Sequence, residues 1–272
     1  MKNNLIEYDS KIDDIKCFST EELQNSCIVI RNYCKNWKLY HNNMFEYIAN
    51  TYGHDRINVE TNINGIINET INIKEYINRI ALGISTIGNW SWQPFYKYPE
   101  LHDQYTLPEK MEDIFFRNSL VCKLVISPWL LMSSKDTKTN IHQDMFRVNG
   151  IVGQLEGEKE FVLVEPSFKL EEGKYYAEEE LHSLSITYYK VILKKGDFLY
   201  FPTQWWHQAK TLKNSVTFIH STVNNANMKN FLDELIIMMP NFIQRVQNGA
   251  KQMSLFGKNI NWVCNGFKRI IE

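Results

Sequence analysis

The chain has 272 residues, of which 44% are hydrophobic and 13% aromatic, and its formal net charge at pH 7 is −1. This composition predicts a packed globular protein with one large domain, or one domain with an extension, and it excludes a disordered chain. The balanced charge gives no support for a partner that is a nucleic acid or an anionic membrane.

The cysteines and the apolar runs bear on the compartment. The five cysteines form no CxxC pair, a usage typical of reduced thiols in the cytosol. The first residues, MKNNLIEYDSKIDD, contain no apolar segment of a secretory signal. No apolar run approaches the roughly 20 residues that a membrane-spanning helix needs. We therefore expect a soluble, cytoplasmic protein.

Residues 1–118 predict an α/β entry region. Ser19 followed by Glu22 has the spacing of a capping box, and Gly53 is suited to a helix C-terminus. The predicted elements are, in chain order, a helix over 19–25, a strand over 27–32, a helix over 43–53, a strand over 56–62 and a helix over 73–82. Residues 85–118 are rich in aromatic residues and proline. They are either irregular structure packed over a sheet or an aromatic-lined substrate surface.

Residues 119–225 predict the β core. Short apolar runs are broken by Gly, Pro, Asn and Ser at a spacing typical of an antiparallel sandwich or barrel. After residue 225 the apolar residues follow helical spacing, beginning with MKNFLDELIIMMP. We expect a mainly β fold with α flanks, in which residues 1–225 form one domain and 226–272 a C-terminal helical extension.

The stretch NIHQDMF places His142 and Asp144 two positions apart, so on a strand both side chains would project to one face. A second histidine, His207, follows 65 positions later in GDFLYFPTQWWHQAKTL. Two histidines and one carboxylate are the ligands of a mononuclear iron site with open coordination positions. Taken alone, neither motif requires a metal ion. A His-x-Asp pair is common at surfaces, and His207 is equally explained as a hydrogen-bonded histidine beside two tryptophans.

A family resemblance rests on two longer segments, HQDMFRVNGIVGQLEGEKEFVLVEPS and KKGDFLYFPTQWWHQAKTLKNSVTFIHS. They contain, in order, His-x-Asp, Gln, Gly-x-Lys, Pro, a Gly-Asp-apolar-Pro-x-x-Trp-Trp-His block and a strand opening with Ser. This pattern resembles the JmjC-type cupins, in the subgroup that includes the asparaginyl hydroxylase acting on hypoxia-inducible factor. The resemblance covers roughly residues 5–225.

The resemblance implies an Fe(II)- and 2-oxoglutarate-dependent oxygenase that uses O2, on a double-stranded β-helix of the jelly-roll or cupin type. The residues implied as iron ligands are His142, Asp144 and His207, and those implied in binding 2-oxoglutarate are Thr139, Lys159 and, by a loose alignment, Asn149. Taken without the resemblance, Lys159 is a solvated lysine between two glutamates. His220 either lines the pocket or is a packed strand residue.

Several functional alternatives stay open at this point. The substrate of an oxygenase would be a peptide, a protein side chain or a small metabolite. A non-oxygenase metal-dependent cupin, such as an isomerase or hydrolase, and a catalytically inactive binding module are the other two classes. The C-terminal helices either form a homodimer face or cover one end of the barrel. The apolar residues of that face are Leu232, Leu235, Ile236 and Met239.

Overall fold

The computed structural model describes residues 4–10, 18–62, 66–84, 86–87, 92, 94–112 and 127–237 of the chain. The chain divides into two compact units, residues 1–227 and residues 228–272. The first unit contains the sheets and the residues that the sequence predicts for the metal and co-substrate site.

The entry region confirms the predicted helices and strands between residues 19 and 82. Its elements are β1 (Leu5–Asp9), α1 (Thr20–Asn25), β2 (Cys27–Arg31), η1 (Tyr33–Asn36), α2 (Met44–Tyr52), β3 (Arg56–Asn62), β4 (Ile66–Asn72), α3 (Ile73–Ala81), β5 (Thr86–Ile87), α4 (Pro94–Lys97) and η2 (Pro99–Gln104). The capping box is present, because the Ser19 hydroxyl accepts from the Glu22 amide at 3.1 Å and the Glu22 carboxylate accepts from the Ser19 amide at 2.8 Å. The sequence patterns did not predict β1, β4 or β5.

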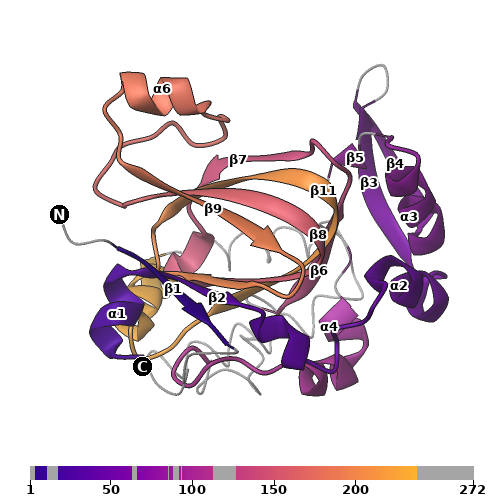
Figure 1. Ribbon diagram of the computed structural model, residues 1–272, viewed down its shortest axis with the longest axis horizontal. Helices are drawn as coiled ribbons and strands as arrows, with labels where there is room; N and C mark the ends of the chain where they lie inside the picture. The colour runs from indigo at the N-terminus through magenta and orange to yellow at the C-terminus, as the bar shows by residue number, and fades with distance from the viewer. Residues whose placement is uncertain are drawn as a thin grey trace, which may run out of the picture. The chain divides into compact units, whose positions relative to one another are not determined.

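The β core follows as β6 (Trp129–Ser133), β7 (Lys138–His142), η3 (Met145–Arg147), β8 (Asn149–Val164), α6 (Glu178–Ser183), β9 (Tyr188–Lys194), β10 (Phe198–Phe201) and β11 (Trp206–Thr222). These strands join β1 and β2 in an eight-stranded sheet of order β1-β2-β10-β8-β11-β6, with β7 on β11 and β9 on β8 (Figure 1). A separate sheet has the order β4-β3-β5.

The two longest strands, β8 and β11, wind the large sheet around an interior. They pair with each other antiparallel along most of their length, with register shifts between Thr211 and Thr217. Each changes its second partner midway, since β8 pairs first with β10 and then with β9, and β11 pairs first with β7 and then with β6. A bent strand that serves two neighbours in this way belongs to two faces of a closed core. The mainly β jelly-roll fold with α flanks is therefore confirmed.

At β2 both faces of the large sheet are buried. On β2, Cys27 and Val29 belong to the apolar cluster inside the barrel, whereas Ile28 and Ile30 face the cluster formed with the entry region. This double burial explains why the strand reads as a continuous apolar run rather than an alternating one.

The described part of the aromatic segment 85–118 packs inward. Trp92 and Phe95 are buried, and the Tyr105 ring lies 4.6 Å from the ring of Phe218 on β11. These contacts favour irregular structure packed over a sheet. Residues 85, 88–91, 93 and 113–118 lie outside the described residues.

An insertion between β8 and β9, residues 165–187, supports β7 from outside the barrel. The Gln208 side chain exchanges two hydrogen bonds with the backbone of Tyr176, at 3.0 and 2.7 Å. The Trp206 indole donates to the Phe168 carbonyl at 3.0 Å. Ile141 of β7 also exchanges backbone bonds with residues 173 and 174. The strand that carries His142 is thus held on both edges.

In the second unit, residues 228–237 are helical, and Leu232 and Ile236 are exposed. Met239, the last member of the predicted dimer face, lies outside the described residues. Among the described helices, none has the length and apolar character that crossing a membrane would require.

Candidate metal centre and its pocket

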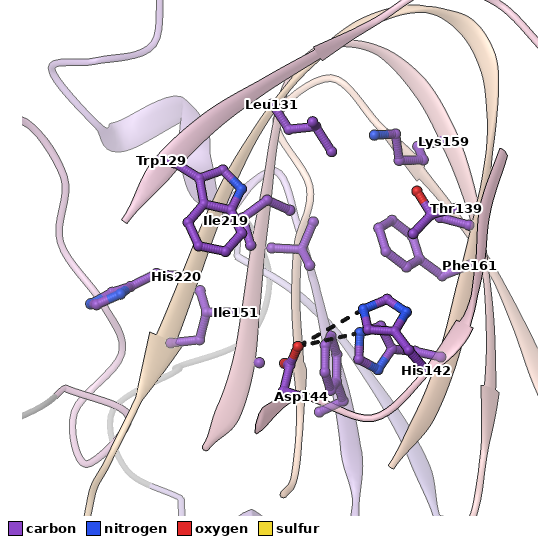
Figure 2. Close-up of a pocket in the computed structure, with 15 residues that line it drawn as sticks. Trp129, Leu131, Thr139, His142, Asp144, Ile151, Lys159, Phe161, Ile219 and His220 are labelled. Carbon is purple, nitrogen blue, oxygen red and sulfur yellow. Dashed lines mark ion pairs between the residues drawn. The ribbon is translucent and has the colours of Figure 1, made fainter. Parts of the chain in front are cut away.

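His142, Asp144 and His207 come together in the barrel (Figure 2). His142 ends β7 and is the register partner of His207 on β11. One potential ligand atom from each residue lies within 4.8 Å of the others. The Asp144 Oδ1 atom is 3.7 Å from Nε2 of His207 and 4.0 Å from Nε2 of His142. The structure therefore brings the three predicted ligands into one cluster.

The backbone around Asp144 differs from the expected strand. β7 ends at His142, and Asp144 precedes the short helix η3 in a segment without sheet partners. The expectation that both residues lie on one strand is wrong in this detail. The Asp144 carboxylate nevertheless faces the two imidazoles, because the chain stays extended through that residue, at φ −65° and ψ 138°, before it turns.

Hydrogen bonds to the backbone fix both imidazoles. Nδ1 of His142 donates to the Asn140 carbonyl at 2.8 Å, and Nδ1 of His207 donates to the Trp205 carbonyl at 3.1 Å. A carbonyl oxygen only accepts, so the proton is on Nδ1 and the Nε2 lone pair is free for a metal ion. Both Nε2 atoms face Asp144.

Burial keeps His207 neutral. Desolvation lowers its pKa to about 4, which outweighs the opposite effect of the Asp144 carboxylate. A neutral imidazole at physiological pH is the form that binds a metal ion.

The cluster opens into a pocket of about 570 Å³, part of which is exposed to solvent. Most of its wall is apolar, with Leu131, Phe161, Phe201 and Ile219 among the lining residues. Pockets with a mostly apolar wall and few polar groups are typical of small-molecule sites.

Lys159 is the second charged feature of this pocket. Its side chain is buried, with 2% of the residue exposed, and no carboxylate pairs with it among the described residues. Its neighbours on β8 point elsewhere, since Glu158 pairs with Lys213 at 2.6 Å and Glu160 with Lys190 at 3.9 Å. The reading of Lys159 as a solvated lysine is therefore wrong. Desolvation lowers its pKa to about 8.

Thr139 lies beside Lys159 at the end of the pocket away from Asp144 (Figure 2). A buried ammonium group without a counter-ion is costly, and a hydroxyl next to it provides a further hydrogen-bond donor. This end of the pocket is therefore suited to an anion of small size.

The structure does not bring Asn149 into the pocket. Its side-chain oxygen accepts a hydrogen bond from the Thr203 amide at 3.1 Å, which ties the start of β8 to the turn before β11. His220 does border the pocket, and its ring also contacts Tyr105 and Phe218 at 6.1 and 6.0 Å. His220 therefore both lines the pocket and packs against its aromatic neighbours.

The sequence patterns did not predict two polar side chains near the centre, Gln143 and Asn227. Gln143 lies between two of the ligands, and its amide donates to the Gln204 carbonyl. Asn227 donates to the Arg147 carbonyl at 3.0 Å. The position of Gln143 inside the motif is the only sequence signal for either contact.

The segment that carries the cluster is similar to a known protein family. Residues 102–231 match the family model of the JmjC domain. The matched segment includes all three clustered ligands together with Thr139 and Lys159. A search of curated proteins gave no match. The matched segment thus carries the donor set of a mononuclear non-haem iron site.

Proposed function

We propose that this protein is an Fe(II)- and 2-oxoglutarate-dependent dioxygenase that hydroxylates a peptide or protein side chain or a small metabolite. The observation that carries the proposal is the pairing, within one apolar pocket, of a His-Asp-His cluster with the buried and unpaired Lys159. A metal site alone would fit many enzymes. A metal site with a cationic anchor at the other end fits a co-substrate that is a dicarboxylate.

The residues suit both groups. His142, Asp144 and His207 offer two neutral nitrogens and one carboxylate oxygen, which is the donor set of non-haem Fe(II) oxygenases and leaves positions for other ligands. Lys159 and Thr139 would hold the distal carboxylate of 2-oxoglutarate. When bound, iron and 2-oxoglutarate supply, with O2, the oxidising power for C–H hydroxylation, and succinate and CO2 are released.

The protein contributes orientation and a dry environment. The two backbone carbonyls keep both Nε2 atoms directed at the centre without rearrangement. The apolar wall limits water around the reacting groups, which strengthens the attraction between Lys159 and a carboxylate. An arriving carboxylate also favours the protonated form of Lys159, so its pKa rises on binding.

The finer assignments belong to the same proposal. Hydroxylation of an amide-bearing side chain is supported by the motif resemblance to the asparaginyl hydroxylase acting on hypoxia-inducible factor. A cytoplasmic location is supported by the free, buried thiols of Cys27 and Cys34. A homodimer through the C-terminal helix is supported by the exposed Leu232 and Ile236.

Anaerobic titration with Fe(II) and then 2-oxoglutarate tests the proposal without a known substrate. The complex of this pair with the enzyme should give a weak visible charge-transfer band. We expect no band with His142→Ala and a much higher 2-oxoglutarate concentration for half-saturation with Lys159→Met. Lys194→Met is the matched control, since Lys194 is an exposed lysine on the neighbouring strand β9.

Two outcomes of this titration would contradict the proposed function. Folded wild-type protein that binds Fe(II) but gives no band with 2-oxoglutarate would contradict an oxygenase and would favour a metal-dependent isomerase or hydrolase. Folded protein that binds neither would favour a binding module.

A further inference from the structure

Asp144 differs from the other two clustered ligands in how it is held. Each imidazole has a backbone carbonyl on its Nδ1 atom. The Asp144 carboxylate accepts no hydrogen bond from any residue in the described part of the chain, and its ion-pair contacts there are with the two Nε2 atoms, at 3.7 and 4.0 Å. Nothing therefore orients this carboxylate through its own oxygens. Its position depends on the backbone of the segment between β7 and β8.

That backbone is not held by the sheet. Residues 143–148 lie between the end of β7 and the start of β8 and have no strand partners. Two consecutive bulky residues in it, Phe146 and Arg147, have φ values of 61° and 51°. The left-handed region costs such residues about 1–2 kcal/mol each, so contacts from outside the segment must compensate for this conformation.

The first such contact lies immediately before Asp144. The Gln143 side chain donates to the carbonyl of Gln204, in the turn between β10 and β11. The next residue of that turn, Trp205, provides the carbonyl that orients His207. One side-chain amide thus ties the Asp144 backbone to the turn that sets the third ligand.

The second contact lies after Asp144. The Asn227 side chain is buried and donates to the Arg147 carbonyl at 3.0 Å and to the Thr222 carbonyl at 3.2 Å. Its oxygen accepts from the Asn224 amide at 2.9 Å. Because its hydrogen bonds at the end of β11 fix Asn227, it can hold Arg147 in the left-handed conformation.

We propose that Gln143 and Asn227 are positioning residues for Asp144. Their two side-chain amides fix the orientation of the carboxylate, as the two backbone carbonyls fix the orientation of the imidazoles. The inference rests on the proposed function, since it assumes that Asp144 binds the metal. Neither side chain touches the reacting atoms. Each acts by fixing the backbone on one side of Asp144.

A double-mutant cycle with Co(II) as the only ligand tests the inference. The proteins are the wild type, Gln143→Met, Asp144→Ala and the Gln143→Met/Asp144→Ala double variant, with affinity measured by calorimetry and by the visible Co(II) spectrum. Changes to residues that orient metal ligands typically cost about 10- to 100-fold in affinity. We expect Gln143→Met to weaken Co(II) binding about 10-fold, and to have no further effect once Asp144 is replaced by Ala.

The matched control is Asn25→Leu. Asn25 is an exposed asparagine on α1 whose amide also donates to a backbone carbonyl, that of Glu21, at 2.9 Å. Its Co(II) affinity should equal that of the wild type. Asn227→Ala provides a second arm with the same expectation, measured below its midpoint of thermal unfolding because loss of a buried amide also reduces stability.

Three outcomes would count against the inference. An equal loss from Gln143→Met with and without Asp144 would mean a general structural effect and would overturn the positioning role. An unchanged affinity in Gln143→Met would do the same. If Asp144→Ala itself leaves Co(II) affinity and spectrum unchanged, the metal centre in the proposed function is overturned, which separates that failure from the other two.

Discussion

Replacing Lys159 by methionine should make the protein more stable. In the folded, ligand-free protein the ammonium group is buried without a carboxylate partner among the described residues, and desolvation lowers its pKa from 10.5 to about 8. Each pH unit of this difference corresponds to about 1.4 kcal/mol. The charged form therefore reduces the free energy of unfolding by about 3 kcal/mol at pH 7. Lys159→Met removes that penalty and keeps an unbranched side chain that is one atom shorter.

The dependence on pH has a definite sign. Between pH 8 and pH 10.5 the unfolded chain retains a proton at Lys159 that the folded protein has lost, so wild-type stability rises with pH across this window. The advantage of Lys159→Met should therefore be fully present below pH 8 and disappear above pH 10.5. Urea unfolding at pH 7 and at about pH 9.5, inside this window, measures the full gain and its decrease.

The exposed-lysine variant Lys194→Met provides the reference, with an expected change within about 0.5 kcal/mol. A Lys159→Met variant that is less stable than the wild type at pH 7 would contradict a buried ammonium group without a partner. A gain in stability that does not shrink as the pH rises would contradict it as well. Either result would mean that the ammonium group has a structural partner.

Three further predictions follow from the same contacts. The wild-type affinity for 2-oxoglutarate, measured by the charge-transfer band, should fall about 10-fold per pH unit above pH 8, because Lys159 must be protonated to bind a carboxylate. An affinity that stays constant up to about pH 9.5 would contradict this. Asp55→Ala should lower the free energy of unfolding by about 2 kcal/mol, because the carboxylate accepts from Trp92 at 3.0 Å. Burial raises the pKa of Asp55, but its hydrogen-bond donors lower the pKa by a larger amount, so the net shift is downward. The advantage of the wild type should therefore vanish in acid, where the carboxylate is protonated. Gln208→Leu should release the 165–187 insertion, detected as faster limited proteolysis within it at unchanged far-UV circular dichroism, and no change in cleavage would exclude this role.

The sequence contains enough information to predict the His-Asp-His cluster and a lysine that faces the pocket. Lys159, Phe161 and Leu163 alternate with outward residues on β8, so an inward lysine follows from strand periodicity once the strand is recognised. The pairing of His142 with His207 required the family pattern, because 65 residues separate them in the chain.

Asn149 aligns only loosely with a co-substrate residue of the family, and its position shows how the inward face of β8 changes along the strand. Val152 and Phe161 both belong to the interior cluster although their numbers differ in parity. The alternation changes near Gly157, which has φ +74° and whose added Cβ would lie 2.1 Å from the Asn214 carbonyl oxygen. Before this irregularity the even-numbered Val152 belongs to the interior cluster and the odd-numbered Leu155 to the cluster formed with the entry region, whereas after it the odd-numbered Phe161 belongs to the interior cluster. Asn149 precedes it and therefore lies opposite to Lys159.

The contacts that hold Asp144 could not be predicted for a different reason. Gln143 and Asn227 each bond to a carbonyl more than 60 residues away. Any residue has such a carbonyl, so the partner depends on how the two turns meet after the sheet has closed. Left-handed backbone at a phenylalanine and an arginine is likewise without a sequence signature.

The pairing of β7 with β11 has a kinetic consequence. His142 and His207 are register partners, so a complete ligand set exists only after two strands distant in sequence have joined. Before that point the chain offers a metal ion only the neighbouring His142 and Asp144. A bound ion should therefore leave the folding rate nearly unchanged and slow unfolding, so that its main effect on the protein is a longer lifetime of the native state.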